Sequence, residues 1–151
     1  MDLMLRASGS MVVDPAAWPT GCDRALASAQ QLRDYAAAEP VNQRAVFITI
    51  FEATAPGHPL APVVRDIIAA LHQMFAGFLV DGIADGSVRP DLDPSVETTR
   101  IQAQILGIAY DYAAGLGARS FPERIAEQVE RMRGRLVPGA DDGEAQLDRQ
   151  R

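Results

Sequence analysis

Two long helical patterns joined by one short polar turn, between residues 60 and 112, limit most strongly what this chain can fold into. In the first pattern, apolar residues recur at spacings of one, three and four, which places them on one broad face of a helix with about 3.6 residues per turn. These residues are Leu60, Val64, Ile67, Ile68, Leu71, Met74, Phe75, Phe78 and Leu79. We therefore expect a long amphipathic helix. The turn that follows contains Gly86, which is placed to end this helix, and Asp93-Pro94, which is placed to start the next.

The second helix of the pair, expected over residues 94 to 117, has two apolar faces. At about 100° per residue, one face is an ordinary core face that carries Ile101, Ile105, Ile108, Ala109, Tyr112 and Leu116. The nearly opposite face is made of small residues and one aromatic, with Val96, Ala103, Gly107, Tyr110 and Ala114. A helix with two apolar faces in a small protein commonly lies between its own core and a partner. The alternative is a central helix inside a single bundle.

Three further helices complete the expected fold. The first runs from about Cys22 to Ala38, and the second covers the run NQRAVFITIFEATA after Pro40. This second run is apolar on every side and rich in β-branched residues, so a strand is a rival interpretation, but a lone strand would have no partner here. We therefore expect a buried helix.

The last helix begins at Ser120, which forms the capping-box pattern with Glu123. It carries a narrow apolar stripe made of Phe121, Ile125, Val129, Met132 and Leu136. The expected fold is an all-α bundle of about five helices.

The composition bounds the class of protein. A chain of 151 residues with 48% hydrophobic content is long enough for one domain, expected over residues 21–137 between a loosely ordered lead-in at 1–20 and a disordered acidic tail at 138–151. The net charge of −6 has the wrong sign for a surface that binds nucleic acid through its phosphates. Because no run reaches about 18 apolar residues and Cys22 is the single cysteine, we expect a cytoplasmic protein with no membrane span and no disulfide.

The sequence gives no positive indication of catalysis. His58 and His72 lie far apart, and no set of Cys, His, Asp or Glu residues has metal-ligand spacing. A calcium loop starting at Asp81 fails at Ile83 and Leu92, where oxygen ligands belong. Gly-x-Ser-x-Gly and glycine-rich phosphate motifs are absent. We therefore predict that the chain is not an enzyme and needs no metal or cofactor.

The segment from Phe78 to Pro94, FLVDGIADGSVRPDLDP, resembles a pattern of the C-terminal regulatory domains of TetR-family transcriptional repressors. In that family, a long helix ends in Gly-x-x-x-Gly-x-x-Arg-x-Asp-x-Asp-Pro, and a helix with a glycine near its centre follows. The matching positions here are Gly82, Gly86, Arg89, Asp91, Asp93 and Pro94, followed by Ile105-Leu106-Gly107-Ile108-Ala109. The resemblance extends over roughly Arg24 to Leu136.

Members of that family begin with three small helices that carry a DNA-binding helix-turn-helix. The residues before Cys22 include one arginine and two prolines, so we expect no such unit in this chain. A naturally short paralogue, a shortened reading frame and an excised fragment are all consistent with this difference. DNA would then be reached only through a missing or partner helix-turn-helix.

The resemblance also implies a mechanism. Family members form homodimers by pairing their last two long helices with those of a second copy, and they enclose an apolar cavity for a small apolar or amphipathic effector. The implied dimer interface consists of Ala103, Gly107, Tyr110, Ala114, Ile125, Val129 and Met132. The implied cavity residues are Phe47, Phe51, His72, Phe75, Phe78 and Tyr112. Two functions stay open. The first is a ligand-sensing, dimerising regulator domain, and the second is a helical interaction module that has no DNA-binding domain and heterodimerises with full-length relatives. A cavity of about 300 Å³ or more favours the first, and a solid core favours the second.

Overall fold

The computed structural model describes residue 14 and residues 16–139, and within these residues the chain is all-helical with no strand. Five helices follow one another: α2 (Gly21–Ala38), α3 (Pro40–Glu52), α4 (Ala61–Asp85), α5 (Pro94–Ala114) and α6 (Phe121–Leu136). The prediction of an all-α bundle of about five helices is therefore confirmed at the level of fold class. The expected lead-in and tail lie mostly outside the described residues.

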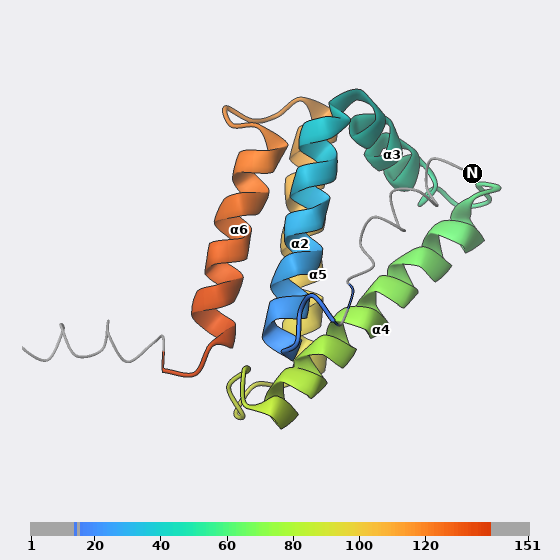
Figure 1. Cartoon of the computed structure of the whole chain (residues 1–151). Coiled ribbons are helices and arrows are strands. Elements are labelled where there is room, and N and C mark those ends of the chain that lie inside the picture. Colours follow the sequence, from blue (N-terminus) through green and yellow to red (C-terminus); the bar gives the residue numbers. More distant parts are fainter. Residues whose placement is uncertain (1–13, 15, 140–151) are drawn as a thin grey trace, which may run out of the picture.

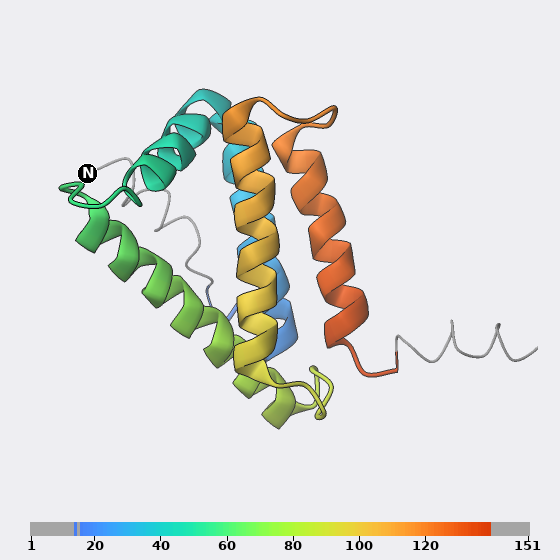
Figure 2. The same ribbon diagram turned by 180° about the vertical axis from the view of Figure 1, so that it is seen from behind.

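Three of the helices form a bundle, and the other two, α3 and α4, lie obliquely to it. α2, α5 and α6 run side by side, whereas α4 crosses them near its C-terminal end and then diverges from the bundle (Figures 1 and 2). α3 covers the other end of the bundle, where it packs against α5 and α2. The N-terminal part of α4 meets α3 through a small separate apolar cluster around Ala53 and Val64.

The ends of the helices follow the signals in the sequence. Asp93 caps α5, because its carboxylate accepts hydrogen bonds from the backbone N–H groups of Ser95 and Val96. Ser120 and Glu123 form the expected capping box at the start of α6. Gly86 ends α4 in the left-handed conformation with φ of 80°. The predicted turn and both of its helix boundaries are therefore confirmed.

α3 is a helix, as predicted, but it is not buried on every side. Val46 and Phe47 face the core, whereas Val41 is 81% exposed and Ile48 is also exposed. The reason is its position: α3 lies at the end of the bundle and other helices cover only one of its sides. The apolar run therefore supplies both core residues and an exposed apolar surface.

The stripe of α6 lies in the core of this chain. Its five members are 0–2% exposed and belong to the main hydrophobic cluster, packed against residues of α2 and α5: Phe121, Ile125, Val129, Met132 and Leu136. Ile125, Val129 and Met132 were expected in a dimer interface, and the structure corrects this expectation. A narrow stripe is enough for an intramolecular contact, because α6 packs closely along α2.

α2 and α4 meet backbone to backbone. A Cβ atom added to Gly21 would lie 2.2 Å from the backbone nitrogen of Gly82 and 2.3 Å from the carbonyl oxygen of Phe78. The turn after α4 strengthens this joint, because the N–H of Gly21 donates to Asp85 at 2.8 Å and the N–H of Cys22 donates to Ser87 Oγ at 3.1 Å. Much of the glycine-rich turn pattern therefore has a structural role here.

α4 is long and apolar enough, by length and composition alone, to cross a membrane. Within its most apolar window 17% of the residues are buried inside the structure. Core helices of soluble proteins share this length and composition, so these properties do not assign α4 to a membrane.

Candidate functional site

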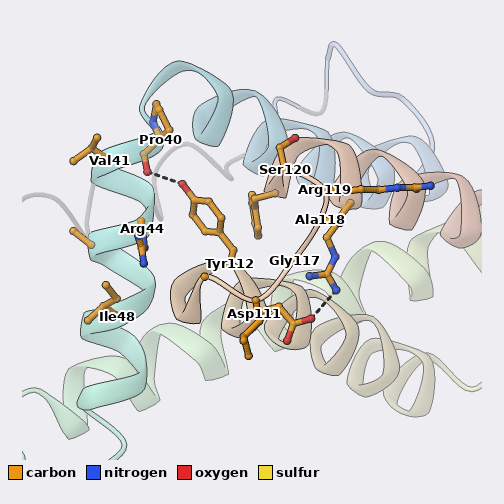
Figure 3. A pocket seen from close by; sticks show the side chains of 15 residues that line it. Pro40, Val41, Arg44, Ile48, Asp111, Tyr112, Gly117, Ala118, Arg119 and Ser120 are labelled. Atoms are coloured by element: carbon orange, nitrogen blue, oxygen red, sulfur yellow. Dashed lines mark hydrogen bonds and ion pairs between the residues drawn. The ribbon is translucent and has the colours of Figure 1, made fainter.

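An open pocket of about 690 Å³ lies at the end of the bundle where α3 faces the loop between α5 and α6 (Figure 3). We call it the end pocket. It is lined by Pro40, Val41, Arg44, Ala45, Ile48, Asp111, Tyr112, Gly115, Leu116, Gly117, Ala118, Arg119, Ser120, Phe121 and Arg124. Its walls thus come from two separate parts of the sequence, residues 40–48 and 111–124, which the fold brings together.

Three hydrogen bonds, from Tyr112 and Arg44, join α3 to α5 beside the end pocket. The Tyr112 hydroxyl on α5 donates to the carbonyl oxygen of Pro40 at 2.8 Å, as drawn in Figure 3. The guanidinium of Arg44 on α3 donates to the carbonyl oxygen of Ala113, at 3.2 Å from Nη2 and 3.4 Å from Nε. Because that carbonyl lies at the C-terminal end of α5, the arginine also complements the negative end of the helix dipole.

The three arginines of the end pocket differ in how their charge is balanced. Arg124 forms an ion pair with Asp111, with 2.8 Å between Nη2 and Oδ2. Arg119 pairs with Glu127 on α6, and in Figure 3 its side chain extends away from Arg44. Arg44 forms no ion pair with any carboxylate of residues 16–139. The end pocket therefore carries one cation without a counter-charge.

The same pocket gathers exposed apolar side chains. Val41 and Ile48 of α3 and Leu116 of the α5–α6 loop are all exposed and line it together. Leu116 is 60% exposed because α5 ends at Ala114, one turn earlier than the sequence pattern predicted. Large apolar side chains brought together at the surface are a feature of binding sites.

A second exposed surface is the outer face of α5, made of Val96, Ala103, Gly107, Tyr110 and Ala114. All five are exposed, and Tyr110 remains 55% exposed although its ring packs edge-on against Phe51. A Cβ atom added to Gly107 would meet nothing within 4 Å. The outer face is therefore open in the single chain.

Beside this face, a hollow of about 390 Å³ follows the contact between α5 and α6. We call it the α5–α6 groove. It is lined by Ala103, Gln104, Gly107, Ile108, Tyr110, Asp111, Arg124, Gln128 and Arg131. Asp111 and Arg124 line both the groove and the end pocket, so their ion pair separates the two hollows.

A polar seam joins α5 to α6, and four of its residues line the groove: Gln104, Asp111, Arg124 and Gln128. Glu97, which is 3% exposed, receives hydrogen bonds from Arg135 and Arg100. Gln104 accepts from Gln128 Nε2 at 2.6 Å, and the third pair of the seam is Asp111 with Arg124. The buried Gln128 Oε1 has no hydrogen-bond partner. Glu97, Gln128 and Arg135 were not predicted as members of a site. The spacing of seven between Glu97, Gln104 and Asp111, which places these three on one face of α5, is the signal that could have indicated the seam.

Of the six expected ligand-binding residues, only one lines the end pocket or the α5–α6 groove. Tyr112 lines the end pocket, whereas Phe47, Phe51, His72, Phe75 and Phe78 line neither this pocket nor the α5–α6 groove. Phe47 and Phe75 are buried core residues, and Phe51 and Phe78 pack against the core. His72 Nδ1 lies 2.8 Å from Gln102 Oε1, so the histidine links α4 to α5.

Within residues 16–139, no group of three or more His, Cys, Asp or Glu side chains could hold a metal ion. No protein-family model matches the chain, and no curated protein or solved structure matches it either.

Proposed function

We propose that this chain is the dimerising, ligand-sensing part of a transcriptional regulator, with the organisation that its resemblance to TetR C-terminal domains implies. Three features support the proposal: the all-helical fold, the outer face of α5 and the end pocket. The observation that carries it furthest is the outer face, where small residues at spacings of four and seven lie exposed on a helix whose other side is packed. DNA would be reached through a helix-turn-helix outside this chain.

The outer face suits a symmetric contact between two copies of α5. Exposed Ala103, Gly107 and Ala114 let two helix backbones approach, while Val96 and Tyr110 offer apolar area to bury. Because the α6 stripe is in the core, α6 would contribute its polar edge at the α5–α6 groove instead. Gln128 lines this groove and its buried Oε1 has no hydrogen-bond partner, which supports an occupant there.

The sensing half of the proposal rests on the end pocket, whose volume of about 690 Å³ falls in the range typical of small-molecule sites. A small apolar or amphipathic effector would bind there and alter the domain that carries the dimer contact. One observation favours the second candidate function, a helical module that has no DNA-binding domain and forms heterodimers with full-length relatives. Five of the six expected cavity residues line neither the end pocket nor the α5–α6 groove.

Gly107→Leu tests the dimer contact by analytical ultracentrifugation. Since nothing lies within 4 Å of a Cβ at Gly107, the single chain accommodates the new side chain. In a symmetric dimer, the overpacking costs about 1–3 kcal/mol at each of two sites, so the dimer should weaken by at least about thirtyfold.

Gly77→Leu is the matched control, because Gly77 is exposed on α4 and is equally open. It should leave the dimer unchanged. A wild-type chain that is monomeric at roughly tens of micromolar, or a dimer unaffected by Gly107→Leu, would refute this contact.

A further inference from the structure

We infer that the end pocket binds an amphipathic anion, a small molecule with one carboxylate-like head and an apolar body. The head would bind at Arg44, and the body would lie on Val41, Ile48 and Leu116. This inference rests on the proposed sensing function and adds to it a location and a chemical class of ligand.

The anionic head follows from the charge balance of the pocket. Asp111 neutralises Arg124 and Glu127 neutralises Arg119, whereas Arg44 meets only the uncharged carbonyl of Ala113. A guanidinium has five N–H donors, and the contacts with Ala113 O use Nε and Nη2. Nη1 is therefore left for an incoming acceptor. A carboxylate, sulfonate or phosphate would satisfy both the free donor and the unbalanced charge.

The apolar body follows from the side chains around that cation. Val41 and Ile48 lie on the same helix as Arg44, three residues before it and four residues after it, so all three share one face of α3. Figure 3 draws Val41, Arg44 and Ile48 along α3, and all three line the end pocket. Leu116, in the loop between α5 and α6, lines the same pocket. A ligand in the end pocket would therefore contact these apolar side chains and the guanidinium of Arg44 at the same time.

A neutral lipophile and a purely ionic ligand both fit the end pocket less well. A neutral molecule would leave the donors of Arg44 without an acceptor and would shield its charge from water. A small inorganic anion would leave the three exposed apolar side chains in water. An amphipathic anion meets both requirements, and a free molecule of this kind suits an open pocket that residues of a single chain line.

Isothermal titration calorimetry of the full chain with decanoate, below its micelle concentration, tests the inference. Decanol, which has the same apolar body without the charge, and acetate, which has the head alone, are the matched ligands. Decanoate should bind measurably, whereas decanol and acetate should bind at least about tenfold more weakly. Equal affinity for decanol and decanoate would overturn the anionic assignment.

Arg44→Gln removes the cation and should weaken decanoate at least about tenfold. Because Arg44 also ties α3 to α5, Arg44→Lys is the second variant: it keeps the charge and should retain more of the affinity than Arg44→Gln. Arg65→Gln is the control, since Arg65 is exposed on α4, outside the end pocket. Circular dichroism establishes that all three variants are folded. Wild-type affinity in Arg44→Gln would overturn the inference.

The outcome also separates this inference from the proposed function. If decanoate fails to bind but a neutral lipophile raises the melting temperature, the anion site is wrong and the sensing proposal stands. If no lipophile of either kind stabilises the chain and the chain is monomeric, the proposed function is itself refuted.

Discussion

Gly21→Ala should destabilise the fold, because the joint between α2 and α4 has no room for a methyl group. The new Cβ would lie 2.2 Å from Gly82 N, 2.3 Å from Phe78 O and 2.5 Å from Gly82 Cα. All three neighbours are backbone atoms inside α4, so rotating a side chain cannot relieve the contact. The two helices must move apart instead, which disturbs the hydrogen bond from Gly21 N–H to Asp85.

The expected loss is at the upper end of the range for overpacking, which is about 1–3 kcal/mol. Urea unfolding followed by circular dichroism measures it as a lower midpoint with an unchanged slope. Gly77→Ala is the control: Gly77 lies within α4 with nothing within 4 Å of a Cβ, and alanine there should stabilise by about 0.5–1 kcal/mol.

The two substitutions should therefore change the stability in opposite directions, and the two variants should differ by about 3.5–4 kcal/mol. If Gly21→Ala were as stable as the wild type, the backbone contact between α2 and α4 would not exist in solution, and the packing argument for the turn would be wrong.

Two further predictions concern titratable groups. Hydrogen bonds from Ser87 and from the Gly21 N–H lower the pKa of Asp85 in the folded state below its ordinary value of 3.8. The ionised carboxylate therefore stabilises the fold above about pH 3.8, and this stabilisation is lost as the pH falls through the lowered pKa of the folded state. Asp85→Asn should thus be less stable than wild type near neutral pH, with a difference that shrinks in acid; urea titrations that show a constant difference down to about pH 3 would contradict this. Burial, together with the charge of Asp23, raises the pKa of the Cys22 thiol, so iodoacetamide should modify it far more slowly in the native chain than in urea. Equal rates in the two states, measured by mass spectrometry, would show that Cys22 is accessible.

Local signals were sufficient for the helix boundaries. Asp93, Ser120 and Gly86 act through hydrogen bonds or backbone conformations that involve only their sequence neighbours, so their roles can be predicted without the fold. The alternation of faces on α5 was equally readable, because helical periodicity alone separates Ile101 from Gly107.

Which surface covers an apolar stripe depends on the tertiary arrangement, and there the sequence was insufficient. The stripe at Ile125 and Met132 is as suitable for an intramolecular neighbour as for a second copy, and the placement of α2 decides between them. The end pocket was missed for the same reason. Arg44 and Leu116 are far apart in the sequence, and they line the same pocket only because α3 folds over the end of α5.

The ion pair between Arg124 and Asp111 has one more consequence, because it forms part of the wall of two hollows at once. Any molecule in the end pocket that draws Arg124 toward itself also changes the charge presented in the α5–α6 groove. Thermodynamic linkage then requires the effect to be reciprocal. If the bound molecule changes the affinity of two chains for each other by some factor, then association of the two chains changes the affinity for that molecule by the same factor. One arginine would thus be sufficient to couple the two surfaces without any helix having to move.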